Sequence, residues 1–194
     1  MMAGLFVLFS CKGKLGEADR IDLSSVPLQT VRNMFVVDTE NGQLKLRMEG
    51  GLMERYETDT SSYELFPNGF QVYVYDEQGD LETTIFAEKA RHTKAKGGKD
   101  EVWMASGNVI TKNIKSREVM ESDTLYWDRT KELIWTDCYV KMYSPDGFMQ
   151  GYGMESDQRA RNTVIRDPFN SYVFIEGEEE PVDSVNFIGP TLKN

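Results

Sequence analysis

The side chains that could perform acid–base, nucleophilic or metal chemistry are few in this sequence. There is a single histidine, His92, in a basic stretch that runs from Lys89 to Lys96. A metalloenzyme of the jellyroll class needs several histidines and a carboxylate around one ion, and one histidine cannot supply them. A Ser-His-Asp triad would have to use His92, but neither Ser106 nor Ser122 has a Gly-x-Ser-x-Gly context.

Nucleotide-binding loops are also missing, since the sequence has neither a Walker A nor a Rossmann glycine pattern. Gly151-Tyr152-Gly153 lies inside an alternating, strand-like segment and lacks the further glycine that such loops require. Paired carboxylates such as Glu121 and Asp123 are to be expected in any acidic protein. The sequence therefore predicts a protein that is not an enzyme and that uses no cofactor and no metal.

The two cysteines have different surroundings. Cys11 follows the uncharged run MMAGLFVLFS, whose ten residues would reach about 15 Å as a helix, half the hydrocarbon thickness of a bilayer. The run has the length of a signal-peptide apolar region, and Leu8-Phe9-Ser10-Cys11 resembles a bacterial lipobox. We therefore predict a signal-peptide region over residues 1–10 and lipidation of Cys11, with the true start codon left open because no basic residue precedes the run. Cys138 would then have no partner for an internal disulfide.

Length and charge fit one folded domain with polar ends. The chain has 194 residues and a formal net charge of −10, which disfavours nucleic acid as a partner. We expect a polar tether over residues 11–32, a β-domain over residues 33–176 and a loose acidic tail over residues 177–194.

Residues 101–157 carry the clearest periodic pattern. In YVKMY at 139–143, apolar and polar residues alternate with the period of a half-buried strand. The segment 102–109, with a predicted turn of small residues inside it, is matched 31 residues later by 133–140, and Glu-Ser-Asp recurs 34 residues apart. A period in the low thirties predicts stacked β-hairpins that share one core.

The rest of the chain is also typical of short strands. Asn41-Gly42 between alternating residues predicts a hairpin turn. Residues 82–96 have a helix-favouring composition, yet Thr83, Ile85 and Ala87 alternate, so we predict strand there. Residues 162–175 predict a closing pair of strands. The fold class is all-β, with a sandwich, a barrel and a jellyroll left open.

Four segments together resemble the LptC family of lipopolysaccharide export proteins, which is related to the LptA and OstA-type β-domains. They are PNGFQVYVYDEQGDLETTIFAEKA, VWMASGNVITKN, ESDTLYWDRTKELIWTDCYVKMY and DGFMQGYGMESD. The match is closest where the unit 127–140 is followed by Gly151-Tyr152-Gly153-Met154, and it covers residues 71–157 well. The resemblance implies a twisted, open β-jellyroll of stacked antiparallel hairpins whose apolar interior holds acyl chains.

The resemblance also implies partners and a location. It implies contact with the LptF and LptG transporter subunits, and strand-to-strand docking onto an LptA-like periplasmic protein. The familiar LptC anchor is a transmembrane helix, so the short apolar segment and Cys11 suggest a lipid anchor in its place. The expected protein is a periplasmic lipoprotein of the inner membrane, which accepts lipopolysaccharide from an ABC transporter and passes it to the next β-jellyroll.

The apolar phase of the predicted strands gives the expected lining of the groove, although the same residues would also suit a closed core. The predicted lipid-binding residues are Phe70, Val72, Val74, Ile85, Ala87, Val102, Met104, Val109, Leu125, Trp127, Leu133, Trp135, Val140 and Met142.

The alternative function is that of a membrane-tethered β-sandwich lipoprotein that binds a glycan or a protein and transports nothing. In that case Tyr73, Tyr75, Tyr139 and Tyr143 would form an aromatic platform for the ligand. The hairpin repeat and the absence of a cysteine pair favour the transport component.

Overall fold

The computed structural model describes residues 26–98, 100–158 and 162–174, in which all regular structure is β-strand. The strands are β1 (Gln29–Glu40), β2 (Gln43–Glu57), β3 (Ser61–Phe66), β4 (Phe70–Tyr75), β5 (Leu81–Ala87), β6 (Lys89–Ala95), β7 (Glu101–Asn113), β8 (Glu118–Asp128), β9 (Leu133–Ser144), β10 (Gly147–Asp157), β11 (Val164–Pro168) and β12 (Tyr172–Val173). All of them pair antiparallel in one sheet. The predicted all-β class and β-jellyroll architecture are confirmed.

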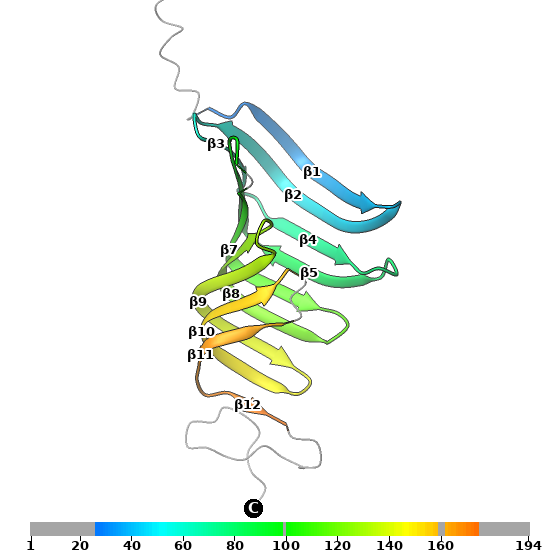
Figure 1. Ribbon diagram of the computed structural model, residues 1–194, viewed down its shortest axis with the longest axis vertical. Coiled ribbons are helices and arrows are strands. Elements are labelled where there is room, and N and C mark those ends of the chain that lie inside the picture. The colour runs from blue at the N-terminus through cyan, green and yellow to red at the C-terminus, as the bar shows by residue number, and fades with distance from the viewer. Residues whose placement is uncertain (1–25, 99, 159–161, 175–194) are drawn as a thin grey trace, which may run out of the picture.

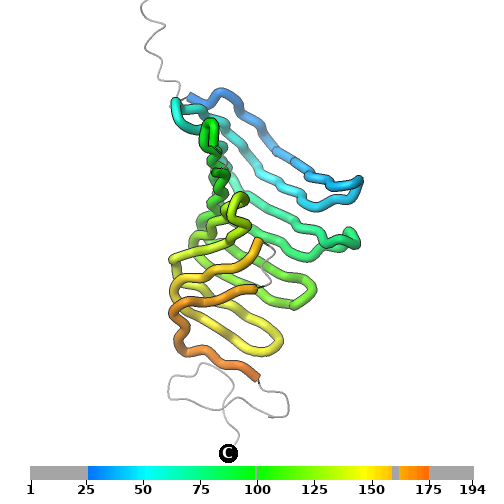
Figure 2. Tube along the Cα trace, in the orientation of Figure 1, coloured from blue at the N-terminus to red at the C-terminus, as the bar shows by residue number. Residues whose placement is uncertain are grey.

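The strands stack along the long axis of the molecule, from β1 and β2 at one end to β11 and β12 at the other (Figure 1). The chain path in Figure 2 shows that the long strands bend partway along their length. The first half of β2 pairs with β4, whereas its second half pairs with β3. In the same way β7 pairs with β6 through its first half and with β5 through its second.

These bends divide the sheet into two walls, which we call the β3–β6 wall and the β4–β5 wall. They meet along a seam that passes through Gly50-Gly51 of β2 and Gly107-Asn108 of β7. Gly51 allows close approach, because a Cβ there would lie 2.7 Å from the backbone oxygen of Asn68. Gly107 and Asn108 both have positive φ, at 77° and 48°, and they form a β-bulge that turns the strand.

Two apolar clusters fill the seam between the walls. The first is built around Ala87, Val109, Val140 and Met154, each at most 1% exposed. The second is built around Phe66 and Phe70, whose rings lie 4.7 Å apart. Burial of this apolar surface along the seam holds the two walls together.

Several expectations about individual elements can now be compared with the structure. The hairpin at Asn41-Gly42 is confirmed, with φ of 51° and 79°. Residues 82–96 form strand rather than helix, within β5 and β6. The turn predicted inside 102–109 is wrong, because β7 continues through it as a bulged strand. The two closing strands, β11 and β12, both pair with β10 and not with each other.

The predicted signal region, Cys11 and the whole of the acidic tail lie outside the described residues. β1 begins at Gln29, inside the range 11–32 that we expected to be tether. Within the described parts of the chain, no helix has the length and apolar character needed to cross a membrane.

Candidate lipid-binding groove

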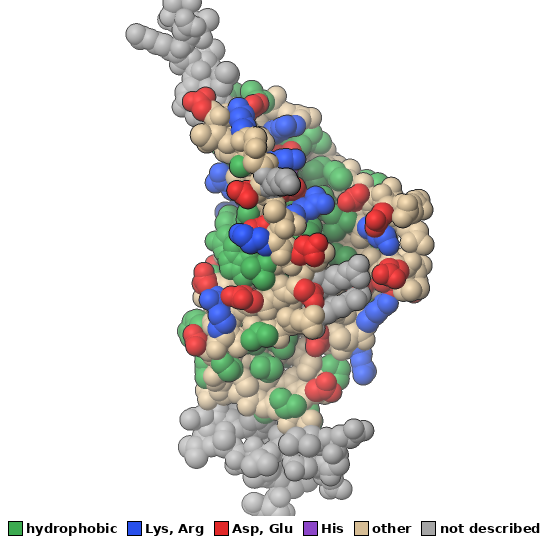
Figure 3. All heavy atoms as spheres, in the orientation of Figure 1, with side chains coloured by type: hydrophobic (Ala, Val, Ile, Leu, Met, Phe, Trp, Pro, Cys, Tyr) green, Lys and Arg blue, Asp and Glu red, His purple; other side chains and the backbone are tan. Residues whose placement is uncertain are grey.

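A groove of about 720 Å³ lies between the two walls. Its floor is apolar, and charged side chains stand at its edges, among them Asp38, Lys45 and Arg129. The space-filling view shows hydrophobic side chains gathered over the middle of the molecule between acidic and basic ones (Figure 3). The apolar lining comes from both walls and consists of Leu46, Met48, Phe70, Val72, Val74, Ile85, Trp103, Met104, Ala105, Leu125, Trp127 and Ile134.

A second and much narrower cavity, of about 50 Å³, continues the groove toward β10. It shares Val74, Ile85, Leu125 and Ile134 with the large groove. Beyond them it is lined by methionines of three strands, Met120, Met142 and Met154, and by polar residues that include Thr83, Thr111 and Ser156. A space of this size holds one or a few water molecules and no acyl chain, so the groove is wide at one end and nearly closed at the other.

Seven of the fourteen predicted lining residues border these cavities from the inner face of the sheet. The side chains of three more, Ala87, Val109 and Val140, share that inner face but are packed inside the first apolar cluster and border neither cavity. The seven that border a cavity from the inner face are Phe70, Val72, Val74, Ile85, Leu125, Trp127 and Met142.

Of the four remaining residues, Met104 borders the large groove, whereas Val102, Leu133 and Trp135 border neither cavity. All four belong to the outer face of the sheet. Directly paired residues of an antiparallel ladder share a face. Met104 pairs with Tyr126, which pairs with Trp135, and the last two stack with ring centroids 5.1 Å apart. Val102 and Leu133 both pair with Asp128 on that same outer face, although the large groove also touches Met104.

The inner positions at these places belong to Trp103 and Ile134, which the sequence reading missed. The runs VWMA and LIW are apolar in both phases, so alternation alone could not choose between them. The bulge at Gly107-Asn108 then fixes the register that turns Trp103 inward. Leu46 and Met48 were also missed as lining residues, although their alternation in the second half of the predicted hairpin was visible.

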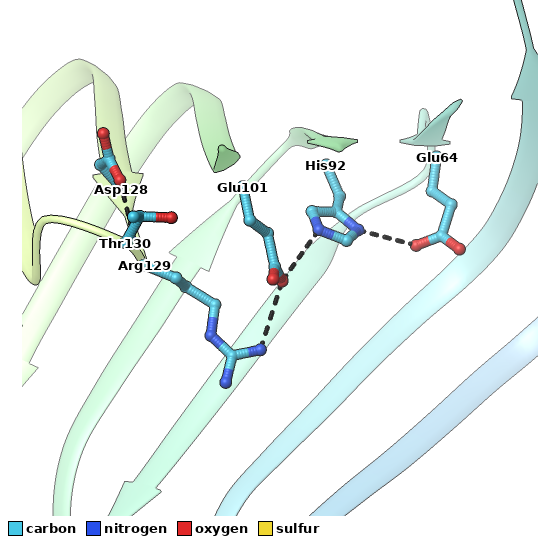
Figure 4. A network of polar contacts seen from close by, with 6 residues as sticks. All are labelled: Glu64, His92, Glu101, Asp128, Arg129 and Thr130. Carbon is cyan, nitrogen blue, oxygen red and sulfur yellow. Dashed lines mark hydrogen bonds and ion pairs between the residues drawn. The ribbon is translucent and has the colours of Figure 1, made fainter. Parts of the chain in front are cut away.

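A chain of polar contacts crosses the inner face of the β3–β6 wall (Figure 4). The two ring nitrogens of His92 on β6 lie 3.1 Å from Glu64 Oε2 on β3 and 3.1 Å from Glu101 Oε1 on β7. Arg129, in the turn after β8, donates from Nη1 to Glu101 Oε1 at 3.2 Å. Four elements are joined in this way beside the large groove, which Arg129 borders.

This chain lowers the pKa of both carboxylates. The hydrogen bond from His92 is the main cause for Glu64, and it outweighs the effect of burial. Burial raises the pKa of Glu101, yet the charges of Arg129 and His92 together bring it below its ordinary value. Both groups therefore stay ionised at neutral pH and serve as fixed acceptors.

The tyrosines of the alternative platform do not form one surface. Tyr73 and Tyr75 lie on β4, and Tyr139 and Tyr143 on β9, with β5, β7 and β8 between them in the sheet. Arg47 covers the ring of Tyr73 at 4.0 Å.

The sheet and its groove define an open β-jellyroll with an apolar interior. No group of metal-binding side chains occurs in the described part of the chain. The family model described as "Lipopolysaccharide-assembly, LptC-related" matches residues 1–167. The chain belongs to this LptC-related family and is a component of lipopolysaccharide transport, in a family that is periplasmic and associated with the inner membrane. No curated protein matches the sequence significantly.

Proposed function

We propose that this protein accepts lipopolysaccharide from an inner-membrane ABC transporter into its groove and passes it to a following periplasmic β-jellyroll. The observation that carries the proposal is the groove of about 720 Å³ with an apolar floor. Each methylene group that leaves water for such a floor contributes about 0.8 kcal/mol. Aliphatic and methionine side chains can adapt to acyl chains of different shape without specific hydrogen bonds.

The two ends of the sheet support a role as a link in a chain of proteins. β1 pairs only with β2 among the described strands, and Phe35, Val36 and Val37 on it are exposed. At the other end β11 and β12 pair with β10 and with no other strand of the described part of the chain. Unpaired strand edges accept a further strand, so that a neighbouring jellyroll would prolong both the sheet and the groove. The partners proposed for these edges are the LptF or LptG subunits and an LptA-like protein.

Cys11 completes the proposal as the site of a lipid anchor that holds the protein at the inner membrane. The sequence around it supports this role, and the residue lies outside the described structure. Treatment of cells with radioactive palmitate should label the wild-type protein and leave Cys11→Ala unlabelled. Equal labelling of both proteins would contradict the anchor without affecting the groove.

The groove is tested by photo-cross-linking to lipopolysaccharide in cells from a probe at Val74. Val74 borders both cavities, whereas Tyr73, one residue earlier, points to the opposite face of β4 and serves as the matched control. We expect a lipid-shifted band from Val74 and none from Tyr73. No adduct at Val74 or at Met48, in a folded and exported protein, would overturn the proposed function.

A further inference from the structure

The inner face of the β3–β6 wall changes from apolar to charged between the seam and the rim. Alternate residues of a strand share a face and lie about 7 Å apart, so three of them form three layers of increasing distance from the seam. The same order occurs on two neighbouring strands, with Ala105, Trp103 and Glu101 on β7, and Leu125, Trp127 and Arg129 on β8 and the turn after it.

The middle layer is a pair of tryptophans. Trp103 and Trp127 are direct partners in the ladder between β7 and β8, so their side chains lie next to each other on the inner face. The ring of Trp103 is held by His92 at 4.2 Å and by Phe70 at 5.5 Å. Both indoles border the large groove.

Neither indole N–H has an acceptor among the residues that the structure describes. Nε1 of Trp103 and Nε1 of Trp127 are buried, and no described residue accepts a hydrogen bond from either of them. The carboxylates of this wall, Glu64 and Glu101, are already engaged by His92 and Arg129. An indole N–H can only donate, and a buried donor without an acceptor destabilises the state that contains it. Each indole N–H is therefore a donor that a carbonyl oxygen of a ligand can satisfy.

We propose that the three layers of this wall orient an acylated glycolipid in the groove. The N–H groups of Trp103 and Trp127 donate to the carbonyl oxygens of the ester or amide linkages between the acyl chains and the sugar. The acyl chains then lie against the apolar layer at the seam. This subsite rests on the proposed function, because it assigns contacts within the same groove.

The chemistry of the two outer layers fits such a ligand. Tryptophan has an apolar ring with one polar edge, and it gathers where hydrocarbon meets polar head groups in membranes. Arg129 at the rim gives one of its five N–H donors to Glu101, so its guanidinium can also meet an oxygen of the head group. Both Nε1 atoms are buried, so the indole rings must shift for their N–H groups to meet a lipid that enters the groove.

The orientation of the bound lipid in the groove is tested by fluorescence quenching in the full-length protein. Trp135, on the outer face, is first replaced by Phe, so that only Trp103 and Trp127 emit. Two stearic acids are added in separate titrations, one spin-labelled near its carboxyl group and the other near its methyl end. We expect the label near the carboxyl group to quench at least twofold more strongly. A matched protein with Trp103→Phe and Trp127→Phe, which emits only from Trp135, should not distinguish the two labels.

The hydrogen bonds are tested by direct binding of purified lipopolysaccharide. Trp103→Phe and Trp127→Phe keep an aromatic ring and remove the N–H group. Each should weaken binding about fivefold, the effect of one hydrogen bond. Trp135→Phe should leave the affinity unchanged, and circular dichroism verifies the fold of all three variants.

The outcomes separate this inference from the proposed function. Stronger quenching by the methyl-end label, equal quenching by both labels, or unchanged affinity of both inner-face variants would overturn the assigned subsite while the groove still binds lipid. An absence of quenching by either label, together with no lipopolysaccharide adduct from Val74, would overturn the proposed function itself.

Discussion

At the scale of single residues, Asp76 joins the turn between β4 and β5 to the turn between β7 and β8. Its carboxylate is almost fully buried and accepts hydrogen bonds from the backbone N–H groups of Gln78 and Asp80, at 2.8 and 2.9 Å. Lys115, in the turn between β7 and β8, forms an ion pair with it. The hydrogen bond from Lys115 is the main reason why the pKa of Asp76 falls from 3.8 to about 2.

We therefore expect an acid-dependent contribution to stability from Asp76. Because its pKa is lower in the folded state, the contribution is complete above about pH 4 and is lost as the pH falls toward 2. Asp76→Asn should lower the Tm by about 2–4 °C at pH 7, and the difference from wild type should shrink between pH 4 and 2. Thermal unfolding across this pH range measures the effect, with the exposed Asp123→Asn as control. A difference that stays constant down to pH 2 would contradict the role of Asp76.

Also at the residue scale, Val74 lies in the groove lining, whereas Val140 lies in the apolar core. Val140 is 0% exposed, and an arginine there would be a buried charge without a partner, so Val140→Arg should not fold. Val74 is half-buried at the groove, where an arginine can extend its charged end to the rim. Val74→Arg should therefore keep the circular dichroism spectrum of wild type and lose bound lipopolysaccharide on purification. Undiminished lipid in folded Val74→Arg protein would argue against the groove.

At the scale of elements, the strand β10 depends on a glycine for its contact with β11. A Cβ at Gly151 would lie 2.5 Å from the backbone oxygen of Asp167 and 2.5 Å from Ile165 Cγ2. Gly151→Ala should push β11 away from β10, at a cost of about 1–3 kcal/mol. Hydrogen exchange at residues 164–168 should become faster. Gly98→Ala in the loop after β6, where a Cβ would meet Ala95 Cβ at 3.3 Å, should change exchange at 164–168 little. Equal hydrogen exchange at residues 164–168 in both variants would show that β11 accommodates the added methyl group without separating from β10.

The elements also show how far the sequence could predict the structure. Alternation identified β4 and the second half of β9, because aliphatic or methionine side chains alternate there with tyrosine and polar ones. It also identified β5 through the alternation of Thr83, Ile85 and Ala87. It failed at VWMA and LIW, where both phases are apolar and the choice of face depends on the bulge at Gly107-Asn108. The polar chain around His92 could not be predicted, since it joins residues of separate strands through pairings that only the register determines.

At the scale of the whole molecule, the two walls enclose a groove whose width is uneven. The large end, near β2 and β4, measures about 720 Å³, and the narrow end, near β9 and β10, about 50 Å³. The narrow end is lined by flexible methionines, which can repack at low cost. The open jellyroll was predictable from the resemblance and the strand pattern, whereas this unequal filling depends on packing between the walls and leaves no periodic signal in the sequence.

The unequal width predicts where lipid rests in the protein without its partners. A cross-linking probe at Leu46, which borders only the large groove, should capture lipopolysaccharide in the purified protein, whereas a probe at Met154, which borders only the narrow cavity, should capture little. During active transport in cells the adduct at Met154 should rise toward that at Leu46, because lipid moving toward β11 must displace the methionines. A probe at Tyr152, an exposed side chain two residues from Met154 on β10, controls for nonspecific capture. Strong capture at Met154 in the purified protein would mean that the narrow end is open at rest, and passage along the groove would then need no repacking of methionines.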